Sequence, residues 1–233
     1  MISEEPTIVV DQDGVSVREM DPSHVAMCDF RLGKEYLDDF DCLNPPIKIA
    51  LDLGNALKYF KSVRKDDYVR LAWDACDSKL RITFAGQNAR TFTVKTLEPT
   101  ETKEDPPVPK LTLDAKVRLL TKALTHALSD LELLNDHAEI SVDERIVRLT
   151  ASNEGDQCDY AMERGDERLI DVRASTQAKA IYSIAWLKEF AKALSQLSEV
   201  ITLELSNNMP IRVSVDLSGA QMHYWLAPRI AEE

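Results

Sequence analysis

The stretch Ile8-Val-Val-Asp-Gln-Asp-Gly-Val-Ser-Val17 resembles Ile140-Ser-Val-Asp-Glu-Arg-Ile-Val-Arg-Leu149, which lies 132 residues further along the chain. Two more matches follow in the same order, both at an offset of 130 residues: Cys28-Asp-Phe30 with Cys158-Asp-Tyr160, and Leu57-Lys-Tyr-Phe60 with Leu187-Lys-Glu-Phe190. Three matches in one order at nearly one offset indicate an internal repeat. The sequence therefore predicts two copies of one domain.

Both halves alternate apolar and polar residues with the two-residue period of half-buried strands. The expected strands are Thr7–Val17, Ile47–Leu53, Tyr68–Trp73, Leu80–Phe84 and Arg90–Leu97, then Ala138–Leu149, Leu169–Ala174, Val200–Leu205 and Ile211–Leu217. Helices are expected at Gly54–Lys65, Thr121–Leu134 and Ile184–Leu197. The predicted fold class is α+β, with mainly antiparallel sheets and few helices.

A proline-rich, charged segment separates the halves, with prolines at positions 99, 106, 107 and 109. Proline lacks a backbone donor and restricts φ, so an extended, exposed connector is expected. The predicted organisation is an N-terminal domain at 1–96, a connector at 97–112 and a C-terminal domain at 113–233. A plain spacer explains the connector equally well.

The composition excludes several functional classes. No apolar run approaches the roughly 20 residues of a membrane span, and the first residues lack the pattern of a signal peptide. The four cysteines and four histidines are dispersed without metal-ligand spacing, and no glycine-rich phosphate loop occurs. We therefore expect no metal, no cofactor and no membrane association.

The charge balance needs a spatial explanation if the partner is a nucleic acid. Forty acidic residues against 28 basic ones give a formal net charge of −12, which argues against phosphate binding unless the cations gather on one surface. Each expected helix does carry cations about one turn apart, beside an apolar face made by residues such as Leu57, Trp186 and Leu197. The candidate phosphate-binding residues are Lys58, Lys61, Arg64, Lys65, Lys122, His126, Lys188 and Lys192. No base-reading or stacking signature accompanies them, so sequence-independent duplex binding is favoured.

Asp21, Ser23 and His24 suggest a hydrolase as an alternative. A catalytic triad needs its three groups to converge, usually from separate parts of the fold, whereas these neighbours flank a proline and should diverge. We expect no enzymatic activity.

The sequence resembles the DNA sliding clamps of the PCNA family, and is nearer to its archaeal members. The resemblance rests on Asp13-Gly-Val15, Met20-Asp-Pro-Ser-His-Val25, the connector and Leu226-Ala-Pro-Arg-Ile230, and it extends over essentially the whole chain. It implies the DNA clamp fold, in which two similar domains of antiparallel sheet carry helices on one face, and subunits form a ring of three around duplex DNA. It also implies a cytoplasmic, nucleoid-associated protein, or a nuclear one in a eukaryote.

The resemblance also implies a partner site. Replication and repair proteins, among them DNA polymerase, flap endonuclease and DNA ligase, insert a short motif called the PIP box into an apolar pocket, and a clamp loader is a further implied partner. The matching positions are Met20, His24, Val25, Val108, Leu111, Pro210, Ala227, Pro228 and Ile230.

The implied subunit contact joins edge strands, here Arg90–Leu97 of one chain and Arg168–Ala174 of the next. The expected contact residues are Arg90, Phe92, Val94, Leu169, Asp171 and Arg173. A homotrimer and a heterotrimer with paralogues both remain open, as does a clamp-like scaffold that binds peptides without encircling DNA.

One part of the repeat has no counterpart. The strand and helix expected at Lys116–Leu134 precede Ile140, but the equivalent positions of the first copy fall before residue 3. Family members have that segment. We expect its absence to leave part of the first sheet uncovered.

Overall fold

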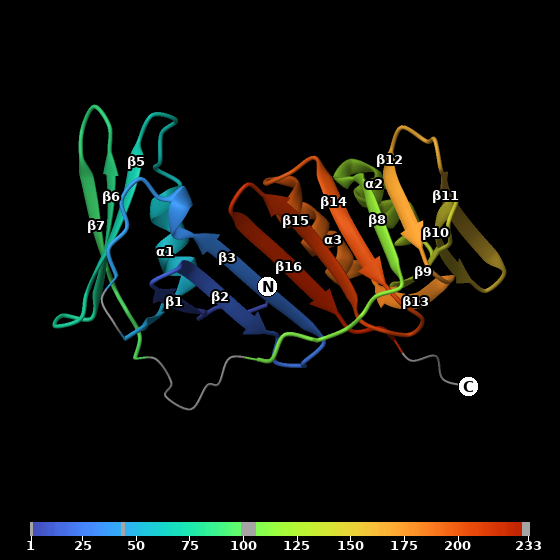
Figure 1. Ribbon diagram of the computed structural model, residues 1–233, viewed down its shortest axis with the longest axis horizontal. Helices are drawn as coiled ribbons and strands as arrows, with labels where there is room; N and C mark the ends of the chain where they lie inside the picture. The colour runs from blue at the N-terminus through green and yellow to red at the C-terminus, as the bar shows by residue number, and fades with distance from the viewer. Residues whose placement is uncertain (1, 43–44, 99–105, 230–233) are drawn as a thin grey trace. The chain divides into compact units, whose positions relative to one another are not determined.

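The structure is a computed structural model that describes residues 2–42, 45–98 and 106–229 (Figure 1). The chain divides into two compact units. The first comprises Met1–Glu19 and Arg31–Pro106, and the second comprises Met20–Phe30 and Pro107–Glu233. Because the segment 20–30 belongs to the second unit, the division is not a single cut along the sequence.

The first unit contains two small sheets and one helix. Its elements are β1 (Thr7–Asp11), β2 (Gly14–Met20), the 3-10 turn η1 (Lys34–Tyr36), β4 (Ile47–Ala50), α1 (Leu53–Phe60), β5 (Tyr68–Asp74), β6 (Lys79–Ala85) and β7 (Arg90–Lys95). β1 pairs antiparallel with both β2 and β4, while β6 pairs with β5 and β7.

The second unit contains two larger sheets and two helices. β3 (Ala26–Gly33) begins in it, followed by β8 (Ala115–Leu120), α2 (Thr121–Leu131), β9 (His137–Val142), β10 (Ile146–Asn153), β11 (Asp156–Glu163), β12 (Leu169–Ala174), β13 (Ala178–Ser183), α3 (Ile184–Ser195), β14 (Val200–Leu205), β15 (Ile211–Leu217) and β16 (Ala220–Leu226). Within this unit, the strands of one sheet follow the order β12-β8-β14-β15-β16-β3, and those of the other follow the order β11-β10-β9-β13. The predicted α+β class with antiparallel sheets is confirmed.

The repeat is visible at the level of single hydrogen bonds. In the β1–β2 turn, Asp11 Oδ1 accepts from the backbone N–H groups of Asp13 (2.8 Å) and Gly14 (3.2 Å). In the β9–β10 turn, Asp143 Oδ1 accepts from those of Arg145 (2.7 Å) and Ile146 (3.0 Å). A side-chain carboxylate closes the same turn in both copies, since aspartate readily accepts from backbone groups two and three residues ahead.

The first turn also requires glycine. Gly14 has φ +144°, and a Cβ atom there would lie 2.1 Å from the carbonyl oxygen of Leu32. No L side chain fits this approach, so the expected strand Thr7–Val17 is interrupted and forms a hairpin. The expected strand Ala138–Leu149 is a hairpin as well, with its turn at Asp143.

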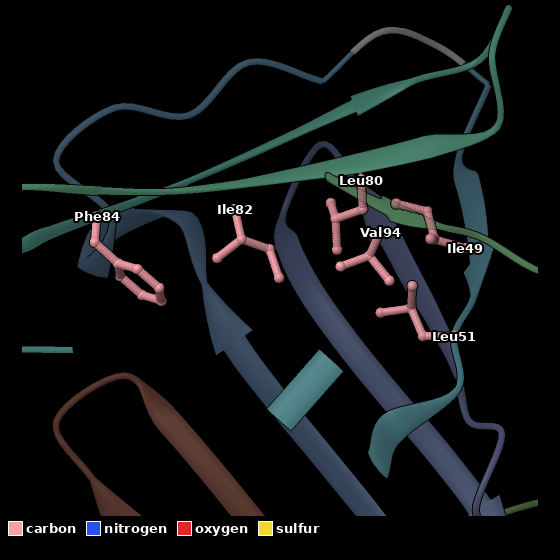
Figure 2. Close-up of a cluster of buried hydrophobic side chains, with 6 residues drawn as sticks. All are labelled: Ile49, Leu51, Leu80, Ile82, Phe84 and Val94. Atoms are coloured by element: carbon pink, nitrogen blue, oxygen red, sulfur yellow. The ribbon is translucent and has the colours of Figure 1, made fainter. Parts of the chain in front are cut away.

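The core of the first unit is small. Figure 2 shows Ile49 and Leu51 from the β4 region, Leu80, Ile82 and Phe84 from β6, and Val94 from β7, all of them buried. Phe92 and Phe60 pack beside it through edge-on contacts with Phe84. Alternation along β6 explains the cluster, because residues 80, 82 and 84 share one face.

The second unit has the larger core. α2 and α3 pack against each other, and α2 also contacts β8, β10 and β11. The expected apolar face of α2 is confirmed, since Leu124, Leu128 and Leu131 are fully buried.

The two units differ at one equivalent strand. In β14, Leu203 is fully buried, and the strand is flanked by β8 and β15. In the matching strand β5, Leu71 lies opposite the core residue Ile82 yet is 56% exposed, and Val69 is 47% exposed. Among the described residues β5 pairs only with β6.

Several expected boundaries were wrong. Helix α1 begins at Leu53, where the Asp52 carboxylate accepts from Asn55 N–H (2.8 Å), and it ends at Phe60. Lys61 is therefore its cap, and Arg64 and Lys65 lie in the following turn, which Asp67 closes by accepting from Arg64 N–H (2.9 Å).

The apolar faces also needed correction. Leu197 and Trp186 were expected to be buried, but Leu197 is 46% exposed and Trp186 is only partly buried. Leu57, expected on the apolar face of its helix, is 51% exposed. Leu197 lies two residues beyond Ser195, the last residue of α3. Strands β3, β11, β13 and β16 were not predicted, because cysteine, glutamine, lysine and aspartate interrupt their alternation.

Candidate functional site

The turn after Met20 is organised by one carboxylate. Asp21, 5% exposed, accepts from the backbone N–H groups of Ser23 (2.9 Å), Val25 (2.7 Å) and Ala26 (2.6 Å). The backbone bonds Asp21 N–H to Ala26 O and His24 N–H to Asp21 O, both 2.9 Å, complete the turn. His24 has φ 58°, in the left-handed region, so its side chain is held outward.

Asp21 is therefore a structural acceptor. Burial raises its pKa, but the three backbone N–H donors outweigh burial and hold the pKa below its ordinary value. Ser23 and His24 are exposed, and within the described residues neither side chain forms a hydrogen bond with Asp21. The three groups do not converge as a triad would require.

The chain's tail meets this turn. Ala227 N–H donates to Val25 O (2.9 Å), and Arg229 N–H donates to Ile181 O in β13 (2.7 Å). Pro210 directly precedes Ile211, which pairs with Leu226, and Ala227 directly follows Leu226. Three segments distant in sequence, the 20–25 turn, the start of β15 and the tail, thus lie together in the second unit.

These segments present apolar side chains that are not fully buried. Val25 is 37% exposed, while Met20, Pro210, Ala227 and Pro228 are half-buried. Of the predicted connector residues, Val108 and Leu111 are half-buried in the same unit, and their place in the site stays a prediction. Ile230 lies outside the described residues.

Trp225 was missed at the sequence level. It precedes Ala227 by two residues, so strand alternation places both on one face, opposite Tyr224, which stacks on Phe190 of α3. Trp225 is 4% exposed, and its indole Nε1 has no hydrogen-bond partner among the described residues. The sequence does contain a signal, because Trp225, an aromatic residue with a polar N–H group, directly precedes the tail motif that starts at Leu226. A tryptophan at such a position is also typical of an ordinary core residue.

The cationic residues lie on or just after the three helices. Lys58, Lys122, His126 and Lys192 are exposed on α1, α2 and α3. Lys188 differs, because its ammonium forms an ion pair with Glu132 and is partly neutralised. In the second unit α2 and α3, which carry Lys122 and Lys192, pack against each other.

The predicted contact residues on the edge strands are mostly engaged within their own chain. Arg90 forms an ion pair with Asp67 and donates to Ser62 O (3.0 Å), Phe92 stacks on Tyr59 (ring centroids 4.7 Å apart), and Val94 is 2% exposed. β7 nevertheless is an edge strand in the described part of its sheet, and its outward residues are Thr91 and Thr93. Contact of Arg90, Phe92 and Val94 with a neighbouring subunit stays a prediction.

β12 is the other expected edge. It ends its sheet in the described part of the chain, with Leu169 only 7% exposed and Ile170 47% exposed. Asp171 and Arg173 form an ion pair with each other (2.9 Å), so both are already partnered along the strand.

Among the residues that the structure covers, no group of three His, Cys, Asp or Glu could hold a metal ion. None of the helices it describes is long and apolar enough to cross a membrane.

The two-unit architecture is that of a DNA clamp. The structure matches PCNA from Thermococcus kodakaraensis with a TM-score of 0.89 at 20% identity, covering 98% of this chain and 92% of that one. It also matches PCNA from A. fulgidus, solved with the C-terminal region of FEN-1 bound, with a TM-score of 0.85 at 25% identity, covering 100% and 92%.

Sequence comparison assigns the family. Residues 2–105 match the model of the proliferating cell nuclear antigen N-terminal domain, and residues 107–230 match that of its C-terminal domain. The chain belongs to the proliferating cell nuclear antigen family. Similar curated proteins include a DNA polymerase sliding clamp of Methanococcoides burtonii, 29% identical over 100% of this chain and 92% of its own length. DNA polymerase sliding clamp 1 of Pyrobaculum aerophilum is 24% identical, with 99% and 91% covered.

Proposed function

We propose that this chain is a DNA sliding clamp: a processivity factor that encircles duplex DNA and tethers replication and repair proteins, without chemistry of its own. The observation that carries the proposal is the pairing of two matched units, both with cations exposed on their helices, in a chain of net charge −12. Family membership over nearly the whole chain supports it.

DNA contact in this proposal is loose. Isolated lysines such as Lys58, Lys122 and Lys192 attract phosphates without reading bases, and each exposed contact is weak and salt-dependent. A ring holds DNA by enclosure, so weak contacts suffice for retention and leave the clamp free to slide. Tight, specific binding would oppose that movement.

Partner capture belongs to the second unit. The half-buried apolar residues around Val25, Pro210 and Ala227 provide burial for the anchors of a PIP box, and the tail backbone can add a peptide as a strand. The A. fulgidus PCNA structure holds the C-terminal region of FEN-1. We extend that class of partner to this chain, with DNA polymerase, DNA ligase and a clamp loader as further partners.

Ring closure would join β7 of one subunit to β12 of the next, through backbone groups and outward side chains such as Thr93 and Ile170. The ring would hold three subunits, either identical or paralogous. Such a clamp would work on DNA in the cell interior, associated with the nucleoid in a prokaryote.

The test reverses charge on the helices. Lys58, Lys122 and Lys192 are replaced by glutamate, and the matched control replaces Arg70, Lys79 and Lys116 on the sheets, with the same change in net charge. We expect the helix variant to lose polymerase stimulation on primed DNA while a PIP-box peptide binds it normally. The control variant should retain both activities.

Equal losses in the two variants would show that total charge, not the helix surface, matters. Normal stimulation by the helix variant would favour a scaffold that binds peptides without encircling DNA.

A further inference from the structure

A second concave feature of the second unit lies beside the tail. It is a cavity of about 480 Å³, lined by residues of β9, β10, β11 and β13 together with Arg229. Polar groups dominate the lining, including Asn135, His137, Glu139 and Arg229. The predicted partner-binding residues do not include any of these.

The tail connects this cavity with the proposed peptide site. The backbone N–H of Ala227 donates a hydrogen bond to the 20–25 turn. Two residues later, the backbone N–H of Arg229 donates to the carbonyl oxygen of Ile181, which lines the cavity. An isolated antiparallel β-bridge between Ile181 and Arg229 pairs the tail with β13. A peptide that pairs with the tail would therefore run from the apolar residues toward the cavity.

The charge at this end of the cavity is uncompensated among the described residues. Arg229 Nη1 lies 3.0 Å from His137 Nδ1, and no carboxylate forms an ion pair with Arg229 in the described part of the chain. Burial, then the charge of Arg229, lower the pKa of His137, so the ring is neutral at neutral pH and accepts the guanidinium hydrogen bond.

The one carboxylate in the lining is already paired. Glu139 forms an ion pair with Lys179 on β13, with 2.7 Å between their charged atoms. Asp136, at the start of β9, acts on His137 only through its charge. Within the described ranges, Arg229 therefore has no acidic partner, and it lines a cavity large enough for a side chain.

We propose that this cavity is a subsite for an acidic side chain of the docked peptide, with Arg229 as the residue that determines the preference. A glutamate or aspartate flanking the apolar anchors would accept a charge-assisted hydrogen bond from Arg229, with His137 and Asn135 beside it. The subsite rests on the proposed function, because it needs a peptide docked along the tail.

The test is a double-mutant cycle. Fluorescein-labelled PIP-box peptides carry either glutamate or glutamine at each flanking position in turn, and fluorescence anisotropy measures binding to the wild type, to Arg229→Gln and to Arg145→Gln. Arg145 is the matched control, in the turn between β9 and β10 and outside this cavity. We expect one position where glutamate improves affinity about fivefold in the wild type and the control, with no preference in Arg229→Gln.

The outcomes distinguish failure of the acidic subsite from failure of the peptide-docking site. The glutamine peptides should bind Arg229→Gln and the wild type equally, which shows that the tail is intact. Binding of all peptides without preference for glutamate, or a preference that survives in Arg229→Gln, would refute the subsite and leave peptide docking in place. Failure of every peptide to bind the wild type would refute the docking site itself.

Discussion

Asp21 shows what a single residue contributes to the partner site. Its carboxylate accepts from three backbone N–H groups within the turn that presents His24 and Val25. Such bonds are stronger than neutral ones, and they set the backbone path without any contribution to chemistry. The proximity of Asp21, Ser23 and His24 in sequence thus reflects the needs of a tight turn.

Replacement of Asp21 by asparagine tests this role. Asparagine keeps one acceptor but places N–H donors where Asp21 Oδ2 now accepts from Ser23, so we expect a loss of about 1–3 kcal/mol in unfolding free energy at pH 7. The folded pKa of Asp21 is lowered, so its contribution is present above the unfolded pKa of about 3.9 and is lost as the pH falls through the folded value.

Urea unfolding of both proteins from pH 7 to pH 2 provides the measurement. The difference in unfolding free energy should shrink below about pH 4. A difference that is constant over this range would mean that the charge of Asp21 has no part in the effect.

At the scale of elements, the repeat allows equivalent strands to be compared within one chain. β5 and β14 both carry a leucine facing the core, yet Leu71 is 56% exposed and Leu203 is fully buried. The difference arises from the surroundings, because β14 is flanked by β8 while β5 has one neighbour in the described structure. Identical patterns therefore give unequal burial.

The matched substitutions Leu71→Ala and Leu203→Ala measure this difference. Burial predicts a cost of about 2–5 kcal/mol at Leu203, where a cavity would form, and under about 1 kcal/mol at Leu71. Denaturant unfolding followed by circular dichroism gives both values. Similar costs at the two positions would show that β5 is covered in solution, by a neighbour that the described residues do not include.

The two faces of the edge strand β7 differ in their surroundings. Arg90, Phe92 and Val94 were chosen for contact with a neighbour, but the three share the face that packs inward on Asp67, Tyr59 and the buried cluster. Thr91 and Thr93 face outward. A one-residue shift exchanges the two faces of a strand, so the position of a strand alone does not fix which side chains face outward.

At the scale of the whole molecule, the net charge of −12 coexists with exposed cations on α1, α2 and α3. Acidic surfaces keep subunits soluble, whereas the helix cations are available to a polyanion. The acidic surface and the helix cations can act together in a ring only if separate chains join through their edge strands. The state of assembly is therefore the property to measure at this scale.

We expect light scattering to give a mass near three times 26.3 kDa for the chain alone or with its paralogues. Thr91→Lys combined with Thr93→Lys should dissociate the assembly without unfolding it, because lysine on an open edge opposes strand pairing. Gln12→Lys combined with Gln196→Lys, also at exposed positions, is the control. A variant that keeps the trimer mass would place the subunit contact elsewhere than β7.

The motifs predicted residues that the fold brings into one unit. Met20, Pro210 and Ala227 do lie in one unit, and the Val25–Ala227 hydrogen bond joins two of the three segments. The sequence did not predict Trp225, Arg229 or His137 as site residues, because no local motif marks them. Their roles depend on neighbours from other strands, such as the contact between Arg229 and His137. Contacts between distant segments leave no local pattern.

By itself, the sequence determined the duplication, the antiparallel α+β class and the family, because turn residues such as Asp11 and Gly14 and the two-residue apolar period act locally. Only the tertiary structure decided which leucine of the repeat is buried, which face of β7 is outward and where the tail is anchored. Those properties depend on which strands become neighbours, and neighbours are chosen by the folding of the whole unit.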